Sequence, residues 1–167
     1  MNRYKVVVVG DHAVGKTSLI RVIAGHEFPE NPYSIYKYYS WESVQCDQFE
    51  LLFQDTASQE DYDRVRTLLY NDAFVVLICF ALNDHNSFES IFTKWLPEIN
   101  QYLLNTPIIL VGTKFDLQLN QFETNEIQNK IINVSALTNF NVYFLLENVK
   151  QIIAEDLKKK NKRKFWK

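Results

Sequence analysis

Short runs of apolar and β-branched residues recur along this chain and predict strands. They lie at residues 6–9, 36–45, 49–54, 74–82, 107–112 and 131–134. The first, fourth and fifth of these runs are apolar throughout, which is the pattern of strands buried on both faces of a parallel sheet. The second and third are separated only by a short turn at residues 46–48, so we expect them to form an antiparallel pair near an edge of the sheet.

Segments with helical periodicity alternate with the predicted strands. We expect helices at residues 16–24, in a short stretch ending at 69, at 87–103, at 142–157 and, as a short piece only, at 122–129. Ser87 is the expected cap of the helix at 87–103, and Pro97 is expected to bend it. This alternation predicts an α/β fold with a doubly wound, mostly parallel sheet and helices on both faces. Ligands of such folds bind beyond the carboxyl ends of the strands.

The composition is that of one folded domain. The chain has 167 residues, of which 47% are hydrophobic, and this is enough for a substantial core. No apolar stretch reaches the ~20 residues that a membrane span needs, and the first residues lack a signal-peptide pattern. Of the two cysteines, Cys46 and Cys79, the second lies within an apolar run. A buried thiol in a reducing, cytoplasmic compartment is therefore favoured over a disulfide.

Charge separates the end of the chain from the rest. Residues 158–167 include seven basic residues and no acidic one, so the preceding body is acidic although the whole chain has a net charge of −2. We predict a globular domain over residues 1–157 and a basic tail over 158–167. A basic tail favours weak peripheral contact with an anionic membrane surface. A solvated and frayed helix end is the alternative interpretation.

The stretch between the first strand and the first helix carries the strongest chemical signal. Gly10, Gly15, Lys16 and Thr17 match the pattern G-x-x-x-x-G-K-[ST], in which consecutive backbone N–H groups surround a phosphate. Lys16 would neutralise the outer phosphates, and the Thr17 hydroxyl would hold Mg²⁺. A strand-to-helix turn that binds nothing is the alternative. The predicted nucleotide-binding residues of this loop are Asp11, His12, Ala13, Val14, Gly15, Lys16, Thr17 and Ser18.

Two aspartates at the ends of later strands complete the predicted site. Asp55 follows an apolar strand and would hold Mg²⁺, directly or through water, although an aspartate at this position can also be an ordinary turn residue. Asp116 follows the strand at 107–112 and could accept two hydrogen bonds from guanine, a donor pair that adenine lacks. The stem of Lys114 could lie across the base. Ser135 and Ala136, followed by Leu137, would present backbone N–H groups to the guanine carbonyl oxygen.

These motifs resemble those of a known family over nearly the whole chain. The segments GDHAVGKT, FPE, DTASQEDYDRVR, VGTKFDL and VSALT are similar to motifs of the Ras superfamily of small GTPases, and QEDYDRVR, KWLPEI and NTPIILVGTKFDL are most similar to the Rho/Rac branch. The resemblance implies a P-loop G domain with a six-stranded sheet, GTP and GDP as ligands, Mg²⁺, and two switch loops that respond to the γ-phosphate. It also implies that Phe28 stacks on the guanine, that Thr113 supports base binding, and that Gln59 orients the attacking water.

Several residues depart from the family pattern near the expected γ-phosphate. His12 and Ser58 both stand where the family has glycine. An imidazole at position 12 would crowd the space that Gln59, the water and an activator's arginine need, so we expect nucleotide binding to persist and hydrolysis to be slow. A Cβ at position 58 restricts φ at a cost of order 1 kcal/mol if a left-handed conformation is required.

The first switch and the C-terminal end also differ from the family. The switch threonine that completes the Mg²⁺ and γ-phosphate site has no direct counterpart: an ungapped alignment places Ile35 there, whereas a one-residue deletion places Ser34 there, which we prefer. The insert typical of the Rho branch is absent between Asp116 and Ser135. The chain as given ends in KRKFWK without a C-a-a-X cysteine, so prenylation of this sequence is not expected.

The sequence therefore predicts a guanine-nucleotide-dependent switch with weak GTPase activity. Lys16, Gln59 and Ser34 are the expected catalytic residues, and Thr17, Asp55 and Ser34 the expected metal ligands. The output would be the binding of effectors, together with exchange or activating factors, through the switch loops, and the Rho/Rac resemblance suggests cytoskeletal regulation. We expect a monomer that does not bind nucleic acid. A permanently GTP-bound binding module and a scaffold with weak nucleotide binding are the alternatives.

Overall fold

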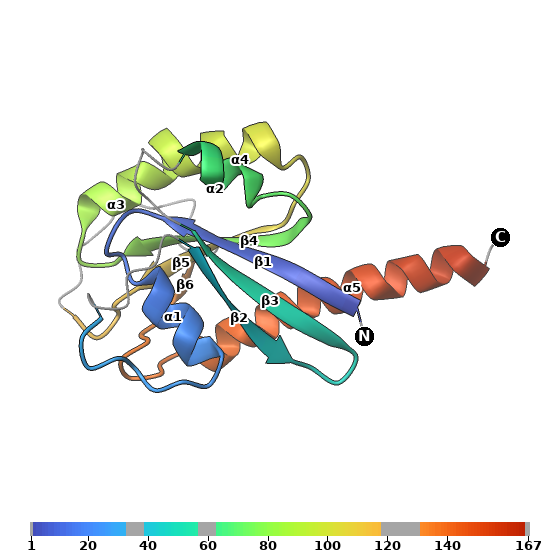
Figure 1. Cartoon of the computed structure of the whole chain (residues 1–167), viewed down its shortest axis with the longest axis horizontal. Helices are drawn as coiled ribbons and strands as arrows, with labels where there is room; N and C mark the ends of the chain where they lie inside the picture. The colour runs from blue at the N-terminus through green and yellow to red at the C-terminus, as the bar shows by residue number, and fades with distance from the viewer. Residues whose placement is uncertain (1, 33–38, 57–62, 118–130, 166–167) are drawn as a thin grey trace.

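The computed structural model describes residues 2–32, 39–56, 63–117 and 131–165 (Figure 1). Its centre is a six-stranded sheet in the order β2-β3-β1-β4-β5-β6. In that order the strands are β2 (Tyr39–Gln45), β3 (Phe49–Thr56), β1 (Asn2–Gly10), β4 (Ala73–Ala81), β5 (Ile108–Thr113) and β6 (Ile131–Asn133). Only β2 and β3 pair antiparallel, and the other neighbours are parallel. The predicted α/β sheet with one antiparallel edge strand is confirmed.

Helices cover both faces of this sheet, as the sequence pattern predicts (Figure 1). The helices are α1 (Lys16–Ile23), α2 (Asp63–Leu68), α3 (His85–Ser90), the π-helical segment η2 (Ile91–Trp95), α4 (Leu96–Tyr102) and α5 (Val142–Phe165). Figure 1 shows α1 and α5 below the sheet and α2, α3 and α4 above it.

The alternation of side chains along β1 explains why two layers of helices are needed. Val6 and Val8 are fully buried in one apolar cluster with residues of α1 and α5. Val7 and Val9 are fully buried in a second cluster with residues of α3, η2 and α4. Since neighbouring side chains of a strand point to opposite faces, an uninterrupted apolar run is stable only when both faces are covered.

Several boundaries differ from the sequence-based expectations. The strand expected at 49–54 continues to Thr56, which brings Asp55 into β3. Ser87 does not cap α3: the cap is Asp84, whose carboxylate accepts a hydrogen bond from the Asn86 N–H, while the Ser87 hydroxyl lies 2.8 Å from the Asp84 carbonyl oxygen. The expected cap was wrong because Ser87 is turned inward toward the end of β4.

The helix expected at 87–103 is continuous in space but changes its type. The π-helical segment η2 lies between α3 and α4, and Pro97 stands in the first turn of α4. Pro97 has no N–H to donate, and a proline ring crowds the carbonyl oxygen four residues before it, which here belongs to Thr93 within η2. The π-helical segment therefore lies in the turn that a proline at position 97 disturbs, and the expected bend itself stays a prediction.

The C-terminal helix is longer than expected. α5 runs from Val142 to Phe165 and so crosses the predicted boundary at residue 157 into the basic tail (Figure 1). The expected short helix at 122–129 lies outside the described residues. Within the part of the chain that the structure describes, no helix is both long and apolar enough to cross a membrane.

Cys46 and Cys79 both carry free thiols, and burial raises the pKa of Cys79 to about 12.

Candidate functional site

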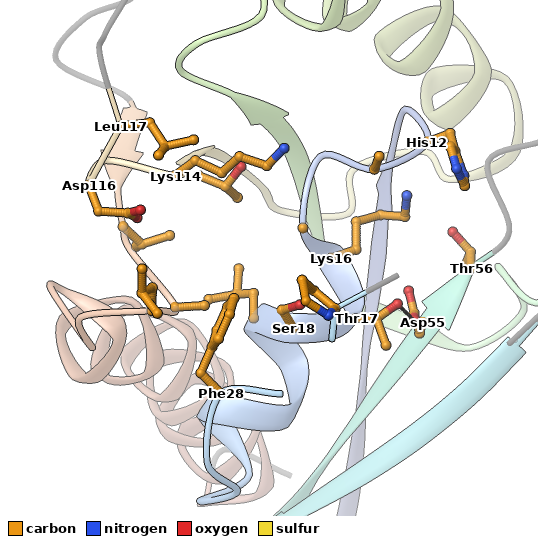
Figure 2. A pocket seen from close by; sticks show the side chains of 18 residues that line it. His12, Lys16, Thr17, Ser18, Phe28, Asp55, Thr56, Lys114, Asp116 and Leu117 are labelled. Carbon is orange, nitrogen blue, oxygen red and sulfur yellow. Dashed lines mark hydrogen bonds between the residues drawn. The ribbon is translucent and has the colours of Figure 1, made fainter. Parts of the chain in front are cut away.

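A cavity of about 480 Å³ opens at the carboxyl ends of the strands. Its walls come from the loops that follow β1, β5 and β6, from the first turns of α1 and from the end of β3 (Figure 2). The predicted site residues that line it are His12, Ala13, Gly15, Lys16, Thr17, Ser18, Phe28, Asp55, Thr113, Lys114, Asp116, Ala136 and Leu137. Figure 2 shows His12, Lys16 and Asp55 at one end of the cavity and Lys114 and Asp116 at the other.

Lys16 is held at the start of α1 by the loop that precedes it. Its Nζ donates hydrogen bonds to the carbonyl oxygens of Gly10 and Asp11, each at 2.8 Å. The side chain is buried, and desolvation lowers its pKa, an effect that the charge of Asp55 opposes. A buried ammonium group that makes only neutral hydrogen bonds gains from an anion placed beside it.

The start of α1 offers further anion-binding groups. Gly15 precedes the helix with φ +99°, and none of the side chains that the structure describes caps the helix there. The first N–H groups of an uncapped helix lack partners within the helix, and the helix dipole adds positive potential at that end. Lys16 and this helix end together make the His12 end of the cavity suitable for phosphate.

Thr17 and Asp55 form a pair of hard oxygen donors beside Lys16. The Thr17 hydroxyl donates a hydrogen bond to Oδ2 of Asp55, while Oδ1 of Asp55 is buried and has no hydrogen-bond partner among the described residues. Burial raises the pKa of Asp55, and the Thr17 hydrogen bond and the charge of Lys16 oppose this rise. A buried carboxylate oxygen without a partner, next to a hydroxyl, fits a small divalent cation such as Mg²⁺.

The pair is too small to hold a metal by protein ligands alone. Among the described residues, no group of three or more His, Cys, Asp or Glu side chains could hold a metal ion. Mg²⁺ is commonly bound through one or two protein oxygens, with phosphate and water completing the shell. The arrangement therefore fits a metal that arrives with a phosphate ligand.

The opposite end of the cavity holds Asp116 in a fixed orientation. Oδ1 of Asp116 accepts a hydrogen bond from the Ser135 hydroxyl, and Ser135 is fully buried. Ser135 in turn accepts a hydrogen bond from the Thr138 N–H at 3.1 Å. The loop after β5 is also tied to the end of β6, since the Phe115 N–H donates to the Val134 carbonyl oxygen at 3.1 Å. Asp116 also lines the cavity, so a ligand there can reach its carboxylate.

Thr113 joins the two ends of the site. Its buried hydroxyl lies 2.5 Å from the carbonyl oxygen of Val14 and 2.9 Å from that of Phe80. It therefore links residues 11–15, the loop between β1 and α1 that matches the phosphate-binding pattern (hereafter the phosphate loop), to the loop after β5. Neither the spacing nor the periodicity of the sequence predicts this contact.

Three predicted nucleotide-binding residues do not line the cavity. Val14 is buried in the apolar core, and Ser135 lies behind Asp116. The carboxylate of Asp11 accepts a hydrogen bond from the indole N–H of Trp95 at 2.8 Å. Ser34, Ser58 and Gln59 lie outside the described residues.

Five further residues line the cavity that sequence reasoning did not predict. They are Leu19, Pro32, Thr56, Leu117 and Val134. Each of them is a neighbour, within a few residues, of a predicted position or motif, and motif matching does not extend to such flanking residues. Thr56 follows Asp55 directly, and its hydroxyl donates to the Val8 carbonyl oxygen at 2.8 Å.

Fold and site together define a class. A strand, a glycine-bounded loop with a buried lysine, and a helix lie at the carboxyl edge of a mostly parallel sheet, beside a carboxylate–hydroxyl pair. This is the arrangement of P-loop proteins that bind nucleoside phosphates.

Comparison with known proteins gives the family within this class. Residues 5–155 match the model of the Ras family. The Rho-related GTP-binding protein RhoD of Homo sapiens is 44% identical over 126 residues, which are 74% of this chain and 60% of that protein. The chain belongs to the Ras family of small GTPases, and its similarity to RhoD supports the Rho branch. The match covers less than two thirds of the length of RhoD.

Proposed function

We propose that this protein is a Rho-type molecular switch that binds GTP and GDP with Mg²⁺, hydrolyses GTP slowly and signals through effector binding. The observation that carries the proposal is one cavity with Lys16 and the Thr17–Asp55 pair at one end and Asp116 at the other. Membership of the Ras family and the similarity to a GTP-binding protein support it.

In this proposal the phosphate end works mainly through position and charge. Lys16 balances the charge of the outer phosphates, and the N–H groups at the start of α1 hold their oxygens. Thr17 and Asp55 would hold Mg²⁺, which neutralises phosphate charge when it is bound. Gln59 and Ser34, which lie outside the described residues, would orient the water and complete the metal site.

The base end would select guanine. Asp116 is held by Ser135, so its orientation is set before a ligand enters. Its carboxylate would accept hydrogen bonds from the N1–H and the exocyclic amine of guanine, and adenine leaves the same carboxylate unpaired at a cost of several kcal/mol. Phe28, Lys114 and Leu117 line the cavity where the base would stack.

His12 is the reason to expect slow hydrolysis. It lines the cavity at the Lys16 end, where the outer phosphate would lie (Figure 2). A bulky ring at this point competes for the space of the attacking water, while the groups that hold the nucleotide remain in place. Ser58 would add to this effect through its restricted backbone.

The same observation favours a second candidate function. If His12 blocks the water completely, the protein would remain loaded with GTP and act as a permanent effector-binding module. Both candidates share the site and differ only in the rate of the chemical step.

Partners and location follow from the same proposal. Effectors and exchange or activating factors would bind through the switch loops, and a cytoskeletal role would follow from the Rho branch. The protein would act as a monomer in the cytoplasm, with the basic end of α5 making weak contact with an anionic membrane.

One pair of measurements tests the proposal. The nucleotide that co-purifies with the protein is identified by chromatography, and single-turnover hydrolysis of added GTP is then timed. Bound GDP with slow turnover supports the switch, and retained GTP without turnover supports the binding module. Lack of any nucleotide binding in the presence of Mg²⁺ would contradict both.

Replacing His12 by glycine tests the cause of slow turnover. We expect His12→Gly to hydrolyse GTP about ten- to a hundredfold faster, since a small displacement of reacting groups can change a rate by that much. Single-turnover rates are compared with those of the wild type. His85→Ala, at an exposed histidine of α3, is the control and should hydrolyse at the wild-type rate. An unchanged rate in His12→Gly would shift the cause to Ser58.

A further inference from the structure

Trp95 connects the second apolar layer to the phosphate loop. Its side chain is fully buried at the end of η2, yet its indole N–H donates to Oδ1 of Asp11 at 2.8 Å. The two residues are 84 positions apart in the sequence. Asp11 lies directly before His12 in the loop whose carbonyl oxygens hold Lys16.

Two cations fix the orientation of the Trp95 ring. The guanidinium carbon of Arg66 lies 5.0 Å from the ring centroid, and the Nζ of Lys94 lies 4.9 Å from it. Such contacts are attractive because the ring face carries negative charge density, and burial strengthens them. Tilting the ring away from this orientation would weaken both contacts.

Arg66 is itself held in place by a buried ion pair. Its Nε and Nη2 donate to the two carboxylate oxygens of Glu98 at 2.9 and 2.7 Å. The Tyr70 hydroxyl donates to the same carboxylate. Burial, and then the hydrogen bond to that negative group, raise the pKa of Tyr70. A bidentate pair of this kind has one preferred geometry. Glu98 on α4 therefore fixes the position of Arg66 of α2 over the Trp95 ring.

The π-helical segment explains how Trp95 reaches the loop. A π-turn adds one residue to a helical turn, which rotates the following side chains relative to an α-helix. Trp95 ends this segment, and α4 begins directly after it. Asp11 is thus held on its side chain by Trp95 and on its carbonyl oxygen by Lys16.

We propose that Trp95 is a positioning residue that fixes the start of the phosphate loop through its hydrogen bond to Asp11, and that Arg66 couples α2 to the loop through the Trp95 ring. The expected effect on nucleotide dissociation rests on the proposed function. The expected effect on amide hydrogen exchange in the loop does not, because the contacts are present in the protein without nucleotide.

The test compares Trp95→Phe with the wild type. Phenylalanine keeps an aromatic ring but removes the N–H. We expect a fluorescent GDP analogue to dissociate about tenfold faster. A hydrogen bond to a charged group changes an equilibrium constant by about tenfold or more. Amide hydrogen exchange in the peptide covering residues 11–17 should also become faster in the protein without nucleotide. Phe88→Leu, on α3 in the same apolar cluster, is the control for loss of aromatic packing and should change neither quantity.

Further variants, alone and combined with Trp95→Phe, separate positioning from general destabilisation. Asp11→Ala should speed dissociation as Trp95→Phe does, and the double variant should be no faster than either alone. Arg66→Met combined with Glu98→Gln removes both charges and should speed dissociation by a smaller factor. Adding these two substitutions to Trp95→Phe should not speed dissociation further, because Trp95→Phe has already removed the hydrogen bond to the loop.

The outcomes distinguish this proposal from the proposed function. If the wild type binds no guanine nucleotide, the proposed function fails, and hydrogen exchange over residues 11–17 still decides the role of Trp95. Unchanged exchange and dissociation in Trp95→Phe would overturn the proposal. Additive effects of Trp95→Phe and Asp11→Ala would overturn it as well, and so would an equal effect of Phe88→Leu.

Discussion

At the scale of single residues, the site combines an ammonium group and a carboxylate that both lose hydration. Desolvation lowers the pKa of Lys16 and raises that of Asp55, so burial disfavours the charged form of each. Their mutual attraction opposes both shifts. A ligand that brings phosphate to Lys16 and a cation to Asp55 would replace part of the lost hydration. The site therefore suits a ligand that consists of an anionic phosphate and a bound cation.

The raised pKa of Asp55 predicts how metal binding depends on pH. Metal binds the ionised carboxylate, so Mg²⁺ binding should weaken as pH falls through the pKa of Asp55, and this loss should begin at a higher pH than for an ordinary aspartate. The measurement is the Mg²⁺ concentration that half-maximally slows nucleotide dissociation, followed over a range of pH.

Asp55→Asn is the matched variant for this pH dependence. It should need about tenfold or more Mg²⁺, because even the loss of a residue that only orients a metal ligand typically costs about 10- to 100-fold in affinity. The remaining pH dependence of Mg²⁺ binding should be smaller in this variant. Asp84→Asn, at the exposed cap of α3, should behave as the wild type. A pH profile that is the same with and without the Asp55 carboxylate would contradict the prediction.

At the scale of elements, the end of β1 sets the path of the phosphate loop. Gly10 has φ +145° and pairs with Cys79 of β4. A Cβ at Gly10 would lie 2.1 Å from the Cys79 carbonyl oxygen. The glycine in the binding motif is thus required by packing against β4, in addition to any ligand. One residue serves the sheet and the loop together.

Gly10→Ala should destabilise the fold strongly. The Cβ meets backbone, which cannot rotate away as a side chain can, so we expect a loss of about 3 kcal/mol or more in the free energy of unfolding. Gly25→Ala is the control: it also has a positive φ of +88°, but apart from its chain neighbours no described residue lies within 4 Å of its Cβ. Its loss should be nearer 1 kcal/mol. Urea denaturation compares them, and equal losses would contradict the role of the Cys79 contact.

At the scale of the whole molecule, α5 carries the basic end away from the acidic body. The helix packs on the sheet through Val142, Leu145, Val149 and Ile153, which are all buried. Beyond these residues it continues to Phe165 and projects from the domain (Figure 1). A projecting basic helix can approach an anionic surface without bringing the acidic body close to it.

This arrangement predicts salt-sensitive membrane contact. Each basic residue near an anionic leaflet contributes about 1 kcal/mol, so the wild type should cosediment with phosphatidylserine vesicles at low salt and release at high salt. Replacing all seven basic residues of 158–167 with glutamine should abolish this binding. Lys150→Gln, on the same helix beside the body, should bind as the wild type. Vesicle binding that persists in the tail variant would contradict the prediction.

Much of the fold and part of the site could be predicted from the sequence. The apolar runs predicted the strands to within a few residues, because burial on both faces leaves a local pattern. The prediction of the α3 cap was wrong because Asp84 and Ser87 are both good capping residues. Which of the two caps the helix depends on which side chain faces β4, and that is Ser87. The end of α5 was placed too early because a charged helix has no apolar pattern to mark it.

The sequence by itself determined the α/β class, the phosphate loop and the aspartates at the strand ends, since each rests on residues close together in the chain. Only the tertiary structure decided that Asp11 is bonded to Trp95 instead of lining the cavity. It also decided that Ser135 supports Asp116 from behind and that Thr113 joins the two ends of the site. These contacts join segments that the sheet brings together. Their existence depends on strand order and helix rotation, which no local pattern of residues encodes.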